Sequence, residues 1–330
     1  GANANVSHVS FRPSPRGKCM RSILPVLAVL SVLAPACSHS DAFPPGDFGT
    51  DQPYIPGPPA RLTANAGADG DIGFSPDGRY LISTVSHRCI AFLPSHQARD
   101  SRWLCAFQDS VESDGYSRPT LAMSGQLAFI LTRQRPFESG PFFKSVLVAP
   151  LADLRDTIDV VPVPFRTGDG ILHTEVTRMA WLRMGILAIL ADGVVYLTNP
   201  LSSTRPRVFT ALTLPARVAT IQSGRSESVL YLGLAGDSRV LAWDANTGEF
   251  STIYDAGAVG SGLVSVGSTY LAIVMPSGLL RVNLATGASE TFPTYNLAIS
   301  ELAMSPDGSD IIVSAFAAGS SETDLYRLGR

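Results

Sequence analysis

The chain has 330 residues, of which 45% are hydrophobic and 16% are charged, and its formal net charge is −3 at pH 7. This length allows a large core in one or two domains, and the charge offers no basic surface for nucleic acid, so no nucleic-acid partner is expected. Charged residues usually make up about a quarter of a sequence. A low charge with 29 glycines and 24 prolines is typical of an all-β protein with many turns, or of a surface partly covered by a partner.

Residues 20–37 have the pattern of an export signal. Three basic residues, Arg16, Lys18 and Arg21, precede an apolar run over residues 23–34. A basic start, a short apolar stretch and small residues before a break are typical of a secretory signal. The run is short for a membrane-spanning helix. The positive charge before it places the rest of the chain outside the cytoplasm, on the periplasmic side of a bacterial membrane.

The end of this segment, residues 34–37 (Ala-Pro-Ala-Cys), resembles the lipobox of bacterial lipoproteins. The resemblance implies that Cys37 becomes the lipidated first residue of the mature chain. Ordinary cleavage and retention as an uncleaved anchor are the alternatives. If Met20 is the true start, residues 1–19 are an upstream extension with no evident fold.

Residues 38–60 are predicted to form a proline-rich tether, with proline clusters at residues 43–48 and 54–59. Neither a helical nor an alternating pattern survives so much proline, so we expect an extended linker with a rise of about 3.1 Å per residue. About twenty residues would hold a domain up to roughly 60 Å from a membrane. The tether is either a passive spacer or a segment whose aromatic residues pack along a partner.

A Ser-Pro-Asp-Gly sequence occurs at residues 75–78 and again at residues 305–308. Proline sets φ at the first corner of a turn, aspartate bonds its own backbone and glycine accepts positive φ. A run of β-forming residues follows each copy, so each predicts a β-hairpin. Two such hairpins at the two ends of a domain indicate a repeated β unit.

Six units of similar plan follow the tether, each a set of short apolar strands separated by turn residues, at the spacing of propeller blades. They cover residues 71–107, 120–163, 176–210, 219–253, 263–292 and 299–328. The sixth unit is one strand short, and residues 61–65 are predicted to fill the missing outer place and so close the ring. The sequence therefore predicts an all-β fold: a single β-propeller over residues 61–330, with six four-stranded blades.

The Ser-Pro-Asp-Gly hairpins and the Asp-Ala-Asn-Thr-Gly turn at residues 244–248 resemble the TolB-like and WD-repeat-like propellers of bacterial envelopes. The resemblance covers residues 61–330 and implies the fold more than the function, because propellers serve many roles. The single Trp-Asp pair, Trp243 and Asp244, lacks the Gly-His partner of true WD repeats.

Two of the four cysteines, Cys89 and Cys105, lie in adjacent predicted strands of the first unit. In an exported domain a disulfide is the expected state of such a pair. Neither these cysteines nor the five histidines have the spacing of a metal site. No cofactor, metal site or catalytic residue is predicted.

The longest insertion, residues 133–144, separates the second and third strands of the second unit, where other units have short turns. Aromatic and arginine side chains carry much of the energy of protein interfaces. We predict a partner-binding patch here, with Tyr116 from a neighbouring acidic loop (residues 109–118) on the same face; the alternative is that the phenylalanines cover the protein's own core. The patch residues within the insertion are Arg133, Arg135, Phe137, Phe142, Phe143 and Lys144.

Three classes of function fit this organisation. The first is a non-catalytic interaction module, an accessory subunit of a membrane-embedded or envelope complex of the transport, outer-membrane-assembly or electron-transfer type. The second is a propeller enzyme, such as a hydrolase, lyase or lactonase, with Glu175, Asn199 and Glu301 as the candidate channel residues. The third is a sensor of small molecules or glycans. Convergent carboxylates at the channel would favour the enzyme.

Overall fold

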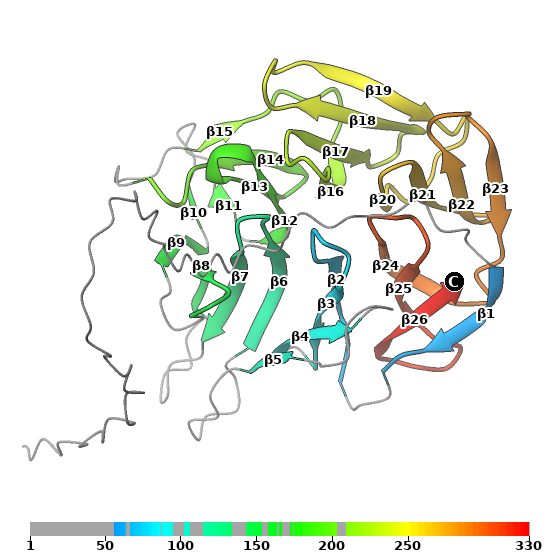
Figure 1. The fold of residues 1–330 in the computed structure, drawn as a ribbon, viewed down its shortest axis with the longest axis horizontal. Coiled ribbons are helices and arrows are strands. Elements are labelled where there is room, and N and C mark those ends of the chain that lie inside the picture. Colours follow the sequence, from blue (N-terminus) through cyan, green and yellow to red (C-terminus); the bar gives the residue numbers. More distant parts are fainter. Residues whose placement is uncertain are drawn as a thin grey trace, which may run out of the picture. The chain divides into compact units, whose positions relative to one another are not determined.

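The computed structural model describes residues 56–63, 67–86, 88–94, 102–105, 115–133, 143–153, 158–163, 165–166, 172–173, 175–202 and 209–329. These residues form six antiparallel sheets of four strands each, arranged around a central axis as a β-propeller (Figure 1). The all-β fold and the six blades predicted from the sequence are confirmed.

In blades 1 to 5 the strands run in chain order from the innermost to the outermost. Blade 1 consists of β2 (Gly70–Phe74), β3 (Tyr80–Val85), β4 (Cys89–Pro94) and β5 (Arg102–Cys105). Blade 2 consists of β6 (Gly115–Leu121), β7 (Gln126–Arg133), β8 (Phe143–Pro150) and β9 (Ile158–Val163). Blade 3 consists of β12 (Val176–Leu182), β13 (Ile186–Ala191), β14 (Val194–Thr198) and β15 (Thr210–Ala211).

The second half of the ring repeats this plan. Blade 4 consists of β16 (Val218–Ser223), β17 (Val229–Leu234), β18 (Arg239–Asp244) and β19 (Phe250–Asp255). Blade 5 consists of β20 (Val264–Val266), β21 (Tyr270–Met275), β22 (Gly278–Asn283) and β23 (Ser289–Phe292). Blade 6 consists of β24 (Ala298–Met304), β25 (Ile311–Phe316) and β26 (Thr323–Gly329), completed by β1 (Pro56–Arg61).

The closing strand lies earlier in the chain than predicted. β1 pairs with β26, and the ion pair between Arg61 and Asp324, at 2.7 Å, holds its end. The strand predicted at residues 61–65 is therefore correct in its place in the ring but wrong in its bounds, and the first part of β1 falls within the predicted tether. Prolines are tolerated here because β1 is an outer-edge strand. The backbone groups along its outer edge need no partner strand, so a missing N–H costs little there.

The innermost strands form a closed ring, in which each contacts the innermost strand of the next blade and β24 contacts β2. A separate apolar cluster fills each of the six junctions between adjacent blades. Between blades 2 and 3, for example, the fully buried Trp181 donates from Nε1 to the carbonyl of Thr120 at 3.1 Å. The strands are apolar on both faces because a blade is covered from both sides.

The predicted hairpin turns are present. In the first Ser-Pro-Asp-Gly turn, the hydroxyl of Ser75 donates to Asp77 at 2.6 Å and Gly78 has a φ of 71°. The second copy repeats this arrangement at Ser305, Asp307 and Gly308. Local chemistry sets these turns, which is why a single sequence predicts them.

Two features of the fold differ from the sequence-based prediction. The loop predicted at residues 109–118 ends earlier, because residues from Gly115 onward form β6, so Tyr116 lies in an innermost strand. An additional two-stranded sheet, β10 (Phe165–Arg166) with β11 (Leu172–His173), lies between blades 2 and 3 in the chain. Its strands are too short to give a period in the sequence.

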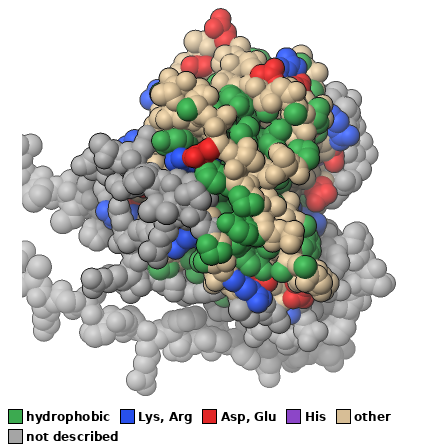
Figure 2. Space-filling view, turned by 90° about the vertical axis from the view of Figure 1, so that its right-hand side faces the viewer, with side chains coloured by type: hydrophobic (Ala, Val, Ile, Leu, Met, Phe, Trp, Pro, Cys, Tyr) green, Lys and Arg blue, Asp and Glu red, His purple; other side chains and the backbone are tan. Residues whose placement is uncertain are grey.

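The only helical turn in the described part of the chain is the 3₁₀ turn η1 (Arg183–Gly185), between β12 and β13. Among these residues no helix is long and apolar enough to cross a membrane. On the side that carries β23 and β1, hydrophobic side chains gather along the middle of the face (Figure 2). The low charge of the sequence is thus visible on the surface.

Candidate functional site

The central channel is the candidate functional site. A register shift interrupts the pairing of the innermost strand with its neighbour in five of the six blades. Such a bulge re-aims the side chains beside it. In blades 1, 2, 3 and 6 the residues at this place are Asp71, Arg118, Arg178 and Glu301, and their side chains meet.

These four side chains form a network of alternating charge, which we call the channel network. Nη1 of Arg118 binds both Asp71 and Oε1 of Glu301, the latter at 2.9 Å. Nη2 of Arg178 lies 3.3 Å from the same Glu301 oxygen. The network therefore connects blades 1, 2 and 3 with blade 6, which lies at the other end of the sequence.

The remaining oxygens of the two carboxylates also have donors. The backbone N–H of Ile72 donates to Oε2 of Glu301 at 2.9 Å. Oδ2 of Asp71 accepts the hydroxyl of Thr84 at 2.9 Å and the N–H of Arg118 at 3.0 Å. Asp71 and Glu301 are 7% and 8% exposed. Hydrogen bonds of this kind compensate the burial of polar side chains and fix the positions of both carboxyl groups.

These neighbours change the pKa of the Arg118 guanidinium. Burial by itself would lower its pKa, but the charges of Asp71 and Glu301 outweigh burial and raise the pKa above its ordinary value. Arg118 therefore stays fully charged in the channel. Positive and negative charges balance within the channel network.

A cavity lies on each side of the channel network, and both cavities are lined by Asp71 and Arg118. The larger has a volume of about 560 Å³ and is also lined by Tyr116, Lys144 and Glu175. The smaller has a volume of about 140 Å³ and is also lined by Arg178, Thr220 and Glu227. The network thus divides the channel into two chambers.

The structure brings two of the predicted partner-binding residues to one cavity. Tyr116 packs edge-on against Phe129, with ring centroids 5.1 Å apart, and lines the larger cavity together with the exposed Lys144. Arg133 and Phe143 are backbone partners at the end of the β7–β8 hairpin. The other predicted patch residues, Arg135, Phe137 and Phe142, lie outside the described residues, as does Cys37.

The three candidate channel residues have different positions. Glu301 lies in the channel network and Glu175 lines the larger cavity. Asn199 follows β14 and is exposed, and its side-chain oxygen accepts the N–H of Leu201 at 3.1 Å. The sequence did not identify Asp71, Arg118 and Arg178 as site residues. A β-bulge has no recognisable sequence pattern, and these side chains come into contact only when the ring of blades closes.

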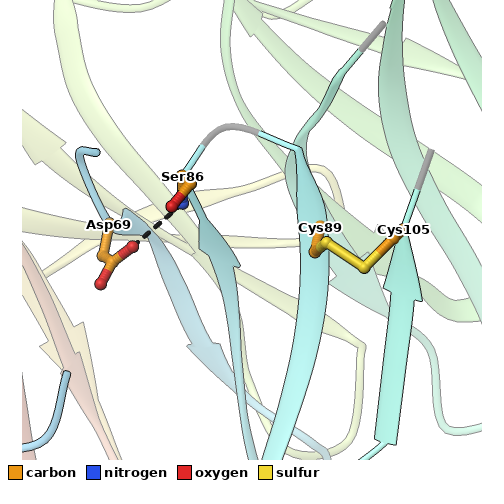
Figure 3. The surroundings of a disulfide bond; sticks show 4 residues. All are labelled: Asp69, Ser86, Cys89 and Cys105. Atoms are coloured by element: carbon orange, nitrogen blue, oxygen red, sulfur yellow. Dashed lines mark hydrogen bonds between the residues drawn. A yellow bond between two sulfur atoms is a disulfide. The ribbon is translucent and has the colours of Figure 1, made fainter. Parts of the chain in front are cut away.

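The predicted disulfide is confirmed. Cys89 and Cys105 face each other as a register pair of β4 and β5 and are bonded (Figure 3). The same view contains the hydrogen bond from the N–H of Ser86 to Asp69, at 3.0 Å. This bond holds the residue directly before β2 against the end of β3. The disulfide crosslinks the outer half of blade 1, away from the channel network.

A second polar cluster lies in blade 3. Nδ1 of the buried His173 is 2.9 Å from Asp192, and its Nε2 is 2.7 Å from the hydroxyl of Tyr196. Both His173 and Tyr196 are 2% exposed. This cluster ties β11 to the β13–β14 turn. In the described part of the chain, no group of three His, Cys, Asp or Glu side chains is placed to hold a metal ion.

No family model and no curated protein matches the chain. Among solved structures, the chain is similar to an oligogalacturonate lyase in complex with manganese, with a TM-score of 0.52 and 12% identity, over 81% of this chain and 78% of that one. It also resembles a chain of the crystal structure of the mitotic checkpoint complex, with a TM-score of 0.46 and 14% identity, over 93% of this chain and 98% of that one. At such identities the likeness to the lyase shows the propeller fold and nothing of its chemistry.

Proposed function

We propose that the chain is an exported β-propeller, tethered at a membrane, that acts as a non-catalytic interaction module. In this proposal the residues before β1 export and anchor it on the periplasmic side, through lipid on Cys37 or a retained signal. The propeller then docks onto a membrane-embedded or envelope protein complex as an accessory subunit. Neither a cofactor nor nucleic acid takes part.

The state of the channel carboxylates carries the proposal. A general acid or base must be free to exchange a proton with substrate. Asp71 and Glu301 instead accept bonds from two arginines, two backbone N–H groups and a threonine hydroxyl. This arrangement favours a structural role for the channel network and directs the search for function to the surface.

The β7–β8 hairpin supports a docking role for blade 2. Its strands have eight residues each and are the longest in the described part of the chain. They are joined by the insertion at residues 134–142, whose sequence contains Arg135, Phe137 and Phe142. Exposed Lys144 stands at its base. Aromatic and arginine residues on such an insertion suit a protein partner.

The test is co-isolation from the native membrane in mild detergent. We expect a stoichiometric partner, identified by mass spectrometry, that is lost from the double variant Phe142→Ser and Phe143→Ser. Phe250→Ser is the matched control, because Phe250 is an exposed phenylalanine on the outer strand of another blade, 38% exposed. A partner retained by both variants would contradict docking through blade 2, and a protein that is isolated alone would contradict the module.

A propeller enzyme or ligand sensor is the second candidate. The observation in its favour is the larger cavity, whose volume lies in the range of small-molecule sites. The similar oligogalacturonate lyase gives an acidic oligosaccharide as a compound to assay. Cleavage of that compound, abolished by Glu175→Gln, would favour the enzyme over the module.

A further inference from the structure

The two arginines of the channel network keep donors that the protein does not use. A guanidinium has five N–H groups. Within the described chain, Arg118 uses only Nη1 in polar contacts, and Arg178 uses only Nη2. The side chains of Arg118 and Arg178 are 26% and 16% exposed, so solvent reaches both of them.

The smaller cavity is the one that both arginines line. Arg118 and Arg178 both line it, from adjacent blades, and Thr220 of blade 4 supplies a hydroxyl. Its volume is about 140 Å³. A cavity needs only about 10–15 Å³ of such space to hold one water, so this cavity has room for several waters or one small ligand.

Backbone strain accompanies this arrangement. Asp71 and Arg118 have φ values of 54° and 53°, in the left-handed region that residues other than glycine rarely adopt. Such conformations are energetically unfavourable and collect at ligand sites. Here the strain occurs at the bulges that turn the two side chains into the channel.

Arginine side chains outnumber carboxyl groups on the wall of the smaller cavity. Arg118, Arg178 and Arg225 line it, with Asp71 and Glu227, while Glu301, which pairs with both Arg118 and Arg178, does not. Burial raises the pKa of Glu227, even though the N–H of Met123 and the charge of Arg183 act in the opposite direction. Asp71 already has its own donors in the channel network. Planar N–H forks of arginine match the geometry of carboxylate and phosphate oxygens.

We propose that the smaller cavity is a binding site for one small oxyanion, a carboxylate, sulfate or phosphate, held between the guanidinium groups of Arg118 and Arg178. The anion would connect blades 2 and 3 through their arginines and leave the surface free for a partner. This site goes beyond the docking function and does not depend on it.

The test measures thermal unfolding of the whole protein at pH 7 against increasing phosphate, with sodium chloride at matched ionic strength. A ligand that binds the folded state raises Tm in a saturable way. We expect a saturable rise for the wild type and at least a tenfold weaker response for Arg178→Gln. Arg239→Gln is the matched control, because it makes the same charge change on an exposed ion pair of blade 4.

Phosphate also stabilises proteins without binding, through exclusion from their surface. An equal, unsaturable rise in wild type and Arg178→Gln would therefore overturn the site. If Arg178→Gln fails to fold, Arg178→Lys keeps a charge near Glu301 but removes the fork, and the same loss is expected. Anomalous scattering from selenate in crystals gives a second readout: an ion between the two guanidiniums supports the proposal, and ions only on the surface contradict it.

Discussion

At the scale of single residues, Glu301 joins blade 6 to blades 1, 2 and 3. It binds Arg118 and Arg178 through one oxygen and the backbone of Ile72 through the other. Removing one member of a buried ion pair costs about 3–5 kcal/mol, because its partners stay buried without compensation. Glu301→Gln should therefore lower the free energy of unfolding by about 3 kcal/mol, measured by urea denaturation.

Asp237→Asn is the control for Glu301→Gln. Asp237 pairs with Arg239 at 2.6 Å on the exposed side of blade 4, where solvent weakens an ion pair. Little change in stability is expected from it. Equal effects of the two substitutions would contradict a structural role for the channel network.

Asp307, in the second Ser-Pro-Asp-Gly turn, should make the stability of the protein depend on pH in the acidic range. Burial would raise its pKa, but hydrogen bonds from Ser305 and Ser309 outweigh burial and lower it. A carboxyl with a lowered folded-state pKa stabilises above its unfolded pKa, about 4, and loses that stability as pH falls through the folded value. Asp307→Asn should flatten the dependence of Tm on pH below about 4; an unchanged slope would contradict it.

At the scale of elements, the disulfide stabilises the outer half of blade 1. Cys89 and Cys105 close a loop with a sequence separation of 16 residues. In the chain-entropy model, a loop of this size is worth roughly 3 kcal/mol. The double variant Cys89→Ala and Cys105→Ala should be less stable by about that amount. A reductant should destabilise the wild type but leave the variant unchanged, and an equal effect on both would refute the assignment.

The strand β1 closes the ring and covers the edge of β26. Its register with β26 is extended beyond Arg61 by the N–H of Leu62, which donates to Leu325 at 2.7 Å. An uncovered edge strand invites pairing with other chains. A chain that begins at Pro56 should remain monodisperse in light scattering, while one that begins at Leu62 should aggregate and unfold at a lower temperature. Identical behaviour would show that closure contributes nothing.

At the scale of the whole molecule, the repeated plan could be predicted from the sequence because turns and alternating strands are local. Proline and glycine set φ within a few residues, so the Ser-Pro-Asp-Gly turns and five complete blades were found directly. The channel network could not be predicted in the same way. Arg118 and Glu301 stand in different blades, and only ring closure and the bulges beside them bring them together.

The bounds of the closing strand illustrate the same limit. Prolines in residues 56–60 indicate a linker when the segment is considered alone. Pairing with β26 overrides this local preference, because the last blade offers an open edge that the chain start can reach. Residue-level chemistry thus predicted the blades, while the closure and the site depend on contacts between distant residues.

The central claim, that the propeller is a subunit of a membrane-associated complex, is tested most directly by the molar mass of the native particle. We would extract the protein from its own membrane in mild detergent and measure the mass of the protein component by light scattering. The account predicts a mass well above that of one chain, 34.9 kDa before any processing, with a second polypeptide in fixed ratio. A particle of one chain in detergent, with no second polypeptide, would contradict it.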